Sequence, residues 1–414
     1  MALLWSLALI VAAVSASKEV FSEVSIHGES GLKIHVPGIF DISSVSAAIK
    51  NTDGTIEIHS LEKEGEGWSL VNDDAKVKPG DSLTYKTSAI IDGENIESEW
   101  KTVPLNYPLA PVRSLRRTVV FRDDFNSWNP NNPKWNVIVT ANQGGTFTKD
   151  RFDENFLYHG RMQLTQLWGK CSYGDNWGCD RSAASDILPP IMSGRIRSVP
   201  AIRYGRVEVR AKIPQGDWLW PAIWLLPRDN HYGGWPRSGE IDIMESRGNL
   251  KVSYGGGNHG INEVSSHLHF GPKWNNNPGP NLAHGEKYSG SWHGWHTYAL
   301  EWTADHIITY VDNQEIMHIR TPNEGWWNRA HLGGGNIWAS GGKNAPFDQP
   351  FQLILNVAVG GGFFPDHASY NTPKPWHGGS HPMRDFWEKR GTWMPTWHGE
   401  EACMAVDYIE MTQY

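Results

Sequence analysis

Three carboxylates lie within six residues of one apolar segment, SGEIDIMES at residues 238–246. Side chains alternate between the two faces of a β-strand, so Glu240 and Asp242 should share a face and Glu245 should point away. One extra residue in the strand, a β-bulge, would return Glu245 to the face of the other two. The spacing then predicts a nucleophile and a general acid/base, with Asp242 between them to hydrogen-bond the nucleophile.

Two tryptophans share a face of a neighbouring apolar segment, WLWPAIWLLP at residues 218–227. Alternation places Trp220, Ala222 and Trp224 together, with the aliphatic residues on the opposite face. Aromatic rings pack on the apolar faces of sugar rings, so tryptophans beside carboxylates favour a saccharide-binding surface. Carboxyl groups about 5–5.5 Å apart would give such a surface the geometry of a retaining glycosidase. Tryptophans that only fill a core would produce the same pattern.

Other interpretations of the acidic segment remain open. A solvated acidic strand, or carboxylates paired with Arg237 and Arg247, would also explain it. His267 and His269 lie two residues apart and so share a strand face, where a carboxylate could add a third metal ligand. A metal-dependent hydrolase is therefore an alternative, although no second metal-type spacing accompanies the two histidines.

The composition favours a β-rich protein of two domains. Its 414 residues exceed one average domain, and 22 Trp with 43 Gly suit a fold with many turns and stacking surfaces. The net charge of −8 argues against nucleic acid or an anionic membrane as a partner. The sequence has no phosphate-binding glycine loop and no zinc-finger spacing. We therefore expect a soluble monomer that requires no cofactor.

Four segments follow one another along the chain. Residues 1–16, MALLWSLALIVAAVSA, predict a signal peptide and a secreted, extracellular protein; a buried N-terminal strand is the alternative. Residues 17–104 contain short alternating strands between turn signals, which predicts a small β-sandwich. Residues 105–117 hold prolines and arginines with little periodicity, which is typical of a linker. Residues 118–414 contain strand after strand with long Gly/Trp loops, which predicts a large β-sandwich or jelly roll.

The cysteine pattern predicts one local disulfide. Cys171 and Cys179 bracket a short loop, CSYGDNWGC, and would pair in an oxidising compartment. Cys403 is then left over, and we expect it to be buried.

A long glycine-rich loop, residues 321–344, carries Trp326, Trp327 and Trp338. Loops of this length inside a compact domain are usually functional or disordered. We expect this loop to wall the sugar-binding surface, which would favour endo action on long chains. A flap that only covers the edge of the sandwich is the alternative.

Several motifs resemble one known family. SGRI, YGRVEVRAKIP, WPAIWLLP and GEIDIME resemble glycoside hydrolase family 16, and E-x-D-x-x-E with a bulge is its laminarinase form. APFDQPFQLILNVAVGG, NTPKPW, MRDFW and MPTW resemble the invertebrate β-1,3-glucan recognition proteins, also called Gram-negative bacteria-binding proteins, and their glucanase relatives. The resemblance implies an all-β protein. An immunoglobulin-like carbohydrate-binding module of the family 39 type would precede a jelly-roll catalytic domain.

The resemblance implies a role for each carboxylate. Glu240 matches the nucleophile, Glu245 the general acid/base, and Asp242 the group that orients the nucleophile. We expect the pKa of Glu245 to be raised by the nearby anions, so that Glu245 is protonated at rest while Glu240 is ionised.

The resemblance also implies substrate contacts. Trp220 and Trp224 match tryptophans that stack on glucose rings, and Arg195 in SGRI matches an arginine that hydrogen-bonds sugar hydroxyls. His269 in LHFG matches a histidine on the strand next to the catalytic one. Many family members carry a structural calcium on the convex face, for which Asp407 is a candidate ligand here.

Together these features predict a secreted, retaining endo-β-1,3-glucanase whose partner is β-1,3-glucan, including that of microbial cell walls. The resemblance also implies a different class of function, because many proteins of the invertebrate branch bind glucan as immune sensors and have lost the carboxylates. This chain has all three carboxylates, which favours the enzyme. An adhesive or structural sandwich is a further alternative.

Limited trypsin digestion tests the predicted domain division. Cleavage in residues 105–117 should release a folded C-terminal fragment that begins after Arg116 or Arg117. N-terminal sequencing of the fragment identifies the cut. If the protein stays folded and no such fragment accumulates, the division is wrong.

Overall fold

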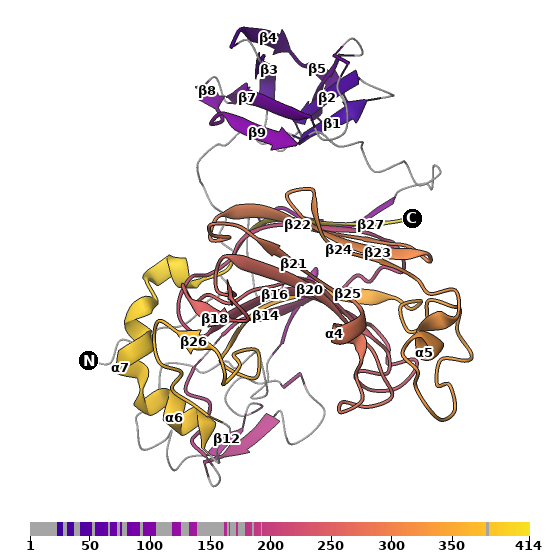
Figure 1. Cartoon of the computed structure of the whole chain (residues 1–414), viewed down its shortest axis with the longest axis vertical. Coiled ribbons are helices and arrows are strands. Elements are labelled where there is room, and N and C mark those ends of the chain that lie inside the picture. Colours follow the sequence, from indigo (N-terminus) through magenta and orange to yellow (C-terminus); the bar gives the residue numbers. More distant parts are fainter. Residues whose placement is uncertain are drawn as a thin grey trace. The chain divides into compact units, whose positions relative to one another are not determined.

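The structure, a computed structural model, contains two compact units that divide close to the end of residues 105–117 (Figure 1). It describes residues 23–27, 31–36, 42–51, 54–64, 67–72, 75–76, 81–91, 94–104, 118–125, 132–138, 161–163, 165, 171–172, 179–183, 186–191, 193–377 and 381–414. The predicted signal peptide and linker lie outside these residues and remain predictions.

The N-terminal unit consists of two antiparallel sheets. Their strand orders are β1–β2–β6–β5 and β4–β3–β7–β8, and β9 also pairs with β7. The strands are β1 (Glu23–His27), β2 (Gly31–Val36), β3 (Ile42–Lys50), β4 (Ile56–Ser60), β5 (Glu62–Glu64), β6 (Gly67–Asn72), β7 (Ser82–Ile91), β8 (Glu94–Glu97) and β9 (Lys101–Pro104). Alternate residues of β7, such as Leu83 and Tyr85, are buried in one core with Leu32 and Ile34 of β2. The two sheets therefore pack face to face. Carbohydrate binding by this unit remains a prediction.

The C-terminal unit is built on two larger antiparallel sheets. One has the order β10–β27–β15–β22–β23–β24, and the other has the order β11–β14–β25–β16–β17–β20–β21. The first contains β10 (Thr118–Asp123), β27 (Ala405–Gln413), β15 (Gly205–Lys212), β22 (Trp295–Trp302), β23 (His306–Val311) and β24 (Gln314–Arg320). The second contains β11 (Trp135–Val137), β14 (Arg195–Ser198), β25 (Phe351–Val359), β16 (Leu219–Pro227), β17 (Glu240–Glu245), β20 (Glu263–His269) and β21 (His284–Tyr288).

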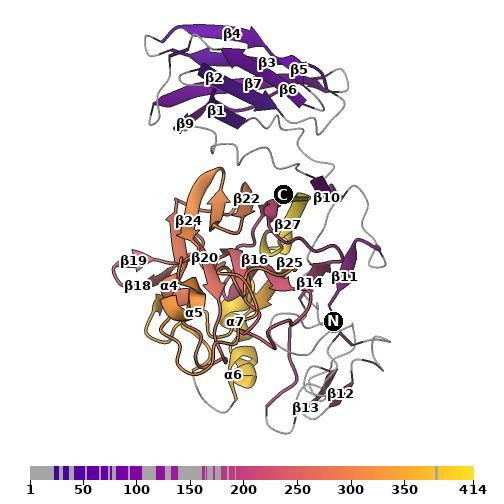
Figure 2. The same cartoon turned by 90° about the vertical axis from the view of Figure 1, so that its right-hand side faces the viewer.

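These two sheets lie one above the other, as Figures 1 and 2 show from two directions. Both contribute to one core, for example through Val207 and Leu300 of the six-stranded sheet and Ile223 and Leu355 of the seven-stranded sheet. The prediction of an all-β sandwich for this part of the chain is confirmed.

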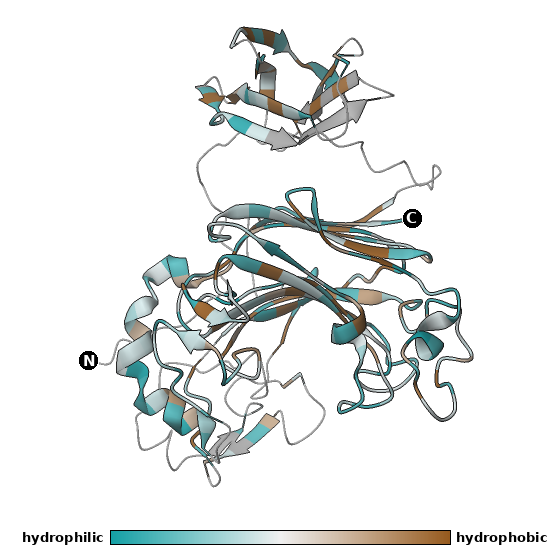
Figure 3. Cartoon of the chain, in the orientation of Figure 1, coloured by the Kyte–Doolittle hydropathy of each residue, from teal (hydrophilic) through white to brown (hydrophobic). Residues whose placement is uncertain are grey.

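Burial along the strands follows their position in the sheets. In β15, buried and partly exposed residues alternate, as expected for a strand with one face on the core. In β25, eight of nine residues are buried, and the strand lies inside the seven-stranded sheet, between β14 and β16. Figure 3 shows the resulting mixture of hydrophobic and hydrophilic residues along the strands.

The remaining described elements are short. They are β12 (Arg161–Gln163), β13 (Asp180–Ser182), β18 (Val252–Tyr254), β19 (Gly257–Asn258), β26 (Ser369–Tyr370), α4 (Gly279–Leu282), α5 (Gly325–Arg329), α6 (Pro382–Glu388), α7 (Arg390–Trp393) and the 3₁₀ turns η1 (Met394–Thr396) and η2 (Gly399–Ala402). Among the described residues, no helix has the length and apolar character needed to cross a bilayer.

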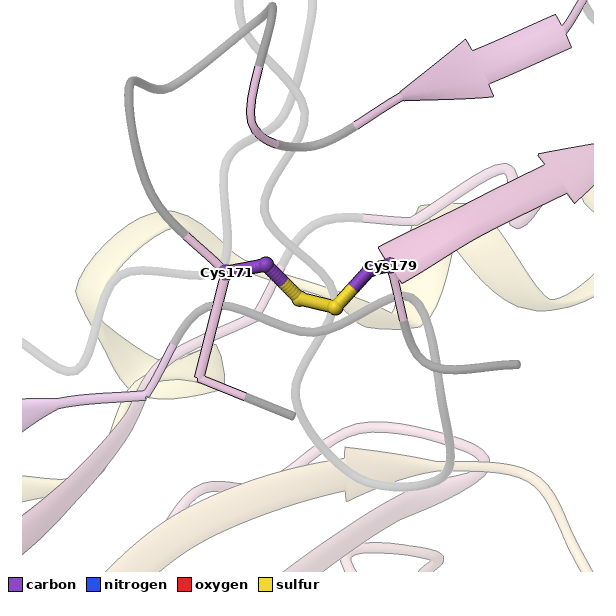
Figure 4. The surroundings of a disulfide bond; sticks show 2 residues. All are labelled: Cys171 and Cys179. Atoms are coloured by element: carbon purple, nitrogen blue, oxygen red, sulfur yellow. A yellow bond between two sulfur atoms is a disulfide. The ribbon is translucent and has the colours of Figure 1, made fainter. Parts of the chain in front are cut away.

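The predicted disulfide between Cys171 and Cys179 is present, with the two Cα atoms 5.7 Å apart (Figure 4). Cys403 is buried as expected, and its Sγ lies 3.8 Å from the carbonyl oxygen of Gly399.

The three tryptophans of residues 321–344 belong to the core rather than to a sugar-binding surface. Trp326, Trp327 and Trp338 are 2%, 6% and 3% exposed, and Trp326 packs on Phe270 of the core. The Trp338 indole donates a hydrogen bond to the backbone carbonyl of Arg237, close before β17. The tryptophans themselves therefore offer no saccharide surface, as in the alternative interpretation of the loop, and the expectation that the loop walls the sugar-binding surface remains a prediction. Their rings fill the edge of the sandwich instead.

Replacing Trp338 with Ala should lower the free energy of unfolding by about 3–5 kcal/mol, because it leaves a large cavity and removes a buried hydrogen bond. Trp274→Ala is the matched control, since Trp274 is 75% exposed and its loss should cost less than about 0.5 kcal/mol. Calorimetric unfolding of both variants measures the difference. Equal melting temperatures would show that the loop does not stabilise the core.

Candidate active site

A β-bulge in β17 brings the three carboxylates to one face of the seven-stranded sheet. In the ladder with β16, Ile223 pairs with Met244 but the next residue, Trp224, pairs with Asp242. Ile243 is therefore the extra residue. The ladder with β20 shifts over the same stretch, between Asp242 and Glu245. The predicted bulge is confirmed.

The bulge separates apolar from acidic side chains of β17. Ile241, Ile243 and Met244 are fully buried in the core between the sheets. Asp242 and Glu245 are 2% and 8% exposed on the opposite face, which we call the carboxylate face. These values rule out the interpretation of β17 as a solvated acidic strand.

Trp220 holds one oxygen of Glu245. Its indole Nε1 donates to Oε1 of Glu245 over 2.9 Å, and its ring stacks on Phe363 with centroids 4.6 Å apart. The Arg247 guanidinium lies 3.8 Å from the Phe363 ring centroid and donates to the Phe363 carbonyl over 2.7 Å. Arg247 thus supports the aromatic pair, and its ion pair is with Glu263 rather than with a β17 carboxylate.

Trp224 and Arg195 form a second aromatic contact on the carboxylate face. The Arg195 guanidinium carbon lies 4.7 Å from the Trp224 ring centroid. Trp224 donates its indole N–H to Oδ1 of Asn356 over 2.7 Å, and Asn356 pairs with Arg195 in the ladder between β25 and β14. The structure therefore places both predicted tryptophans beside the carboxylates, and the predicted arginine against the ring of Trp224.

His269 faces Glu240 across the β17–β20 ladder, as expected for a histidine on the neighbouring strand. Its Nε2 lies 3.3 Å from Oδ2 of Asp242 and 3.8 Å from Oε1 of Glu240. Its Nδ1 lies 2.7 Å from Nδ2 of Asn277. The ring of Trp235, which is 47% exposed, lies 5.8 Å from the His269 ring at the edge of the group.

His267 pairs with the predicted acid/base. Its Nδ1 lies 3.2 Å from Oε2 of Glu245. Burial raises the pKa of Glu245, but the hydrogen bond and charge of His267 and the charge of His269 outweigh it, so the pKa is lowered. Burial lowers the pKa of His267, yet the hydrogen bond and charge of Glu245 outweigh it and raise the pKa. The pair is thus best described as an imidazolium beside a carboxylate.

The other two carboxyl groups shift in the opposite direction. Burial and repulsion from Asp242 raise the pKa of Glu240 well above its ordinary value. Burial and repulsion from Glu245 raise the pKa of Asp242 in the same way. The expected raised pKa of Glu245 is therefore wrong for this structure, and the raised pKa of Glu240 opposes the ionisation that the nucleophile needs. For Glu245, the physical cause is its hydrogen bond with His267. The sequence had suggested His267 only as a metal ligand.

Two groups among the described residues have the geometry to hold a metal ion: Glu240, Asp242 and His269, and Asp242, Glu245 and His267. Both lie on the carboxylate face, so a metal there would coincide with the proposed chemistry. Asp407, the candidate for structural calcium, forms an ion pair with Arg210 over 2.5 Å. Calcium remains a prediction.

The β-sandwich gathers carboxylates, tryptophans and an arginine on one sheet face, an arrangement that suits a carbohydrate. Residues 128–333 match the family described as glycosyl hydrolases family 16. A β-1,3-glucan-binding protein of Hyphantria cunea is 35% identical over 92% of this chain and 92% of its own length. The chain therefore belongs to glycoside hydrolase family 16.

Two further relatives differ in the function that their names give. A β-1,3-glucan-binding protein of Penaeus monodon is 44% identical over 62% of this chain and 74% of its own length. Glucan endo-1,3-β-glucosidase A1 of Niallia circulans is 40% identical over 41% of this chain and 23% of its own length.

Several residues of the site were not predicted from the sequence. They are the supports of the predicted groups: Asn277, Asn356, Phe363, Trp235 and the hydrogen-bonding role of His267. For His267, the period-two spacing with His269 already placed it on the carboxylate face. The sequence therefore indicated the position of His267, but it did not indicate that Glu245 would be its hydrogen-bond partner.

Glu240→Gln should stabilise the protein, and increasingly so as the pH rises. The pKa of Glu240 is higher in the folded protein than in the unfolded chain, where it is near 4.5. The group therefore contributes fully to stability below its unfolded pKa, and this contribution is lost as the pH rises through the folded pKa. The amide cannot ionise, so the variant escapes this loss. At neutral pH we expect a melting temperature a few degrees higher, since 1 kcal/mol corresponds to roughly 2–4 °C in a domain of this size.

The matched control for this prediction is Glu324→Gln, which changes an exposed carboxylate outside the site. Melting temperatures of both variants and the unchanged protein, measured from pH 4 to about pH 8, test the prediction. A Glu240→Gln increment that stays constant or shrinks with rising pH contradicts it.

Proposed function

We propose that the chain is a secreted endo-β-1,3-glucanase that hydrolyses its substrate with retention of anomeric configuration. The observation that carries the proposal is the bulge in β17, which gathers Glu240, Asp242 and Glu245 on one buried face. A binding surface alone would not need two buried carboxyl groups beside a third, because like charges close together are costly. A two-carboxylate hydrolysis does need them.

Each carboxylate has a distinct part in this proposal. Glu240, once its proton has passed to Asp242, attacks the anomeric carbon as a carboxylate, and Glu245 donates a proton to the oxygen of the leaving sugar. Water, deprotonated by Glu245, then releases the glycosyl group from Glu240. Asp242 hydrogen-bonds the nucleophile, and its proximity to both glutamates lets a proton move among the three groups as their charges change.

The hydrogen bond from His267 adds a requirement to this cycle. Glu245 is a carboxylate in the resting site, so it must gain a proton before it can act as an acid. His267 holds a proton 3.2 Å away and can supply it when sugar displaces water and the ion pair loses solvation. Trp220 keeps the Glu245 carboxyl group oriented during both steps.

The substrate class follows from the aromatic groups and from the relatives. Trp220, Trp224 and Arg195 present stacking surfaces and hydrogen-bond donors beside the carboxylates, as a sugar chain requires. The relative from Niallia circulans is named an endo-1,3-β-glucosidase, which supports β-1,3 linkage and endo action. We extend the proposal to soluble glucan and to glucan of microbial walls, with the N-terminal unit as an auxiliary glucan-binding module.

A second candidate function is glucan binding without hydrolysis. The relatives from Penaeus monodon and Hyphantria cunea are both named β-1,3-glucan-binding proteins. In that case the carboxylate face would bind sugar through its tryptophans and arginine, and the carboxylates would only accept hydrogen bonds. Incubation of the purified protein with laminarin, followed by a reducing-end assay, separates the two functions.

Glu240→Gln and Glu245→Gln should both abolish laminarin hydrolysis, but they should differ on an activated aryl glucoside. Loss of the nucleophile lowers the rate by about 10⁴-fold or more on either substrate. Loss of the acid/base lowers it by about 10²–10⁴-fold on laminarin, and less when the leaving phenol needs no proton. Azide should rescue only Glu245→Gln and give a β-glycosyl azide, because a small anion attacks the glycosyl-enzyme without a general base. Product NMR and turnover rates measure these effects.

Asp242→Asn is the intermediate control, since it leaves both reacting groups in place. All three variants should still bind laminarin, because Trp220, Trp224 and Arg195 are unchanged. Azide rescue of Glu240→Gln to a β-configured glycosyl azide would instead show that the two glutamates have exchanged roles. Activity equal to that of the unchanged protein in all three variants would exclude the mechanism.

A further inference from the structure

Asp242, Glu245 and His267 each offer a ligand atom, and these atoms lie within 4.8 Å of one another. The distance from Nδ1 of His267 to Oε2 of Glu245 is 3.2 Å. Two ligands of a tetrahedral zinc ion, with bonds of about 2.0–2.1 Å, are separated by about 3.3 Å. The His267 imidazole and the Glu245 carboxylate therefore already have the spacing of two zinc ligands. Asp242, which lies on β17 with Glu245, supplies the third ligand.

The neighbouring group of Glu240, Asp242 and His269 is less suited to a metal. The backbone N–H of Phe270 donates to Oδ1 of Asn277 over 3.0 Å, which fixes the orientation of the amide. Nδ2 of Asn277 must then donate to Nδ1 of His269. In neutral His269 the proton consequently lies on Nε2, the nitrogen that faces the carboxylates. That nitrogen has no lone pair available for a metal.

Asp242 has the coordination capacity that such a site needs. The side chain is 2% exposed, and its Oδ2 accepts no hydrogen bond from the described residues, although Nε2 of His269 lies 3.3 Å away. A buried carboxylate oxygen without a hydrogen bond is costly. Trp220 occupies Oε1 of Glu245, which leaves Oε2 directed toward His267. One oxygen from each carboxylate is thus available.

We propose that Asp242, Glu245 and His267 bind a transition-metal dication of the zinc type, which replaces the proton between Glu245 and His267. An imidazole with carboxylates suits Zn²⁺ and its transition-metal neighbours better than Ca²⁺ or Mg²⁺, which take oxygen ligands. A metal on Glu245 blocks proton transfer to and from that group, so the cation acts as an inhibitor. Metal binding does not depend on hydrolysis, whereas the inhibitory consequence rests on the proposed function.

Calorimetric titration of the metal-free full-length protein with zinc chloride tests the site directly. His267→Gln should weaken the highest-affinity site by roughly 10–100-fold or more, since the loss of groups that merely orient ligands already has an effect of that size. His284→Gln is the matched control, because His284 is exposed, pairs with His267 in the β20–β21 ladder and has its ring 6.5 Å away. Zinc affinity should be unchanged in this control. Equal affinity in the protein with and without His267 overturns the proposal.

Cobalt(II) binding gives a second measurement. It uses the unchanged protein, so it does not require that a variant folds. Bound to the unchanged protein at this site, it should show the intense visible absorption of four-coordinate cobalt, and excess zinc should remove it. Only the weak absorption of six-coordinate cobalt would overturn the proposed geometry. Zinc binding that requires His267, in a protein that never cleaves laminarin, supports the metal site and refutes the proposed function. Laminarin cleavage that saturating zinc does not slow refutes the inhibition.

Discussion

The structure of the site depends on one constraint, the crowding of three carboxyl groups on one face of a single, largely buried strand. A β17 strand without a bulge could not place all three carboxyl groups on that face. Strict alternation would turn Glu245 into the core and Met244 onto the carboxylate face. The bulge at Ile243 avoids this conflict, since the apolar residues of β17 all enter the core while the acidic ones leave it. Core packing and acid–base chemistry therefore impose the same local geometry.

The charges that result are offset by residues of the flanking strands. Trp220 of β16 donates to Glu245, and His267 and His269 of β20 lie beside the carboxyl groups. Because β17 is an interior strand, each carboxylate has neighbours on both sides. An edge strand would offer partners on one side only, and water would take the place of the others.

Much of the fold was predictable from alternation and turn residues. The alternating or apolar segments SLTYKTSAII, WHTYALEW and FQLILNVAV form β7, β22 and β25, because strand period and burial leave a direct imprint on the sequence. The bulge was predictable for the same reason, since the spacing of the acidic residues makes sense only with one extra residue. Trp220, Trp224 and His269 lie beside the carboxylates, as the resemblance of their motifs implied, and their contacts with a substrate remain predictions, as do those of Arg195.

The expectations failed or stayed open where the outcome depends on tertiary contacts, which a single sequence does not specify. Which nitrogen of His267 meets which oxygen of Glu245 depends on the pairing of two strands, and this pairing reversed the expected direction of the pKa of Glu245. The sequence left the role of the tryptophans of residues 321–344 open, because a core and a sugar-binding surface use the same large aromatic side chains. Only their burial separates the two cases.

The strand order of the C-terminal unit has a consequence for how the chain folds during synthesis. β27 lies between β10 and β15, and β25 lies between β14 and β16, so strands from late in the sequence fill interior positions among strands made much earlier. Neither large sheet can close until the ribosome has delivered residues 351–359 and 405–413. Until then, β16 has an open edge, and neither β16 nor β17 has a complete core beneath it. Such non-local pairing folds slowly and exposes apolar strands for longer, which makes the nascent chain a natural substrate for chaperones.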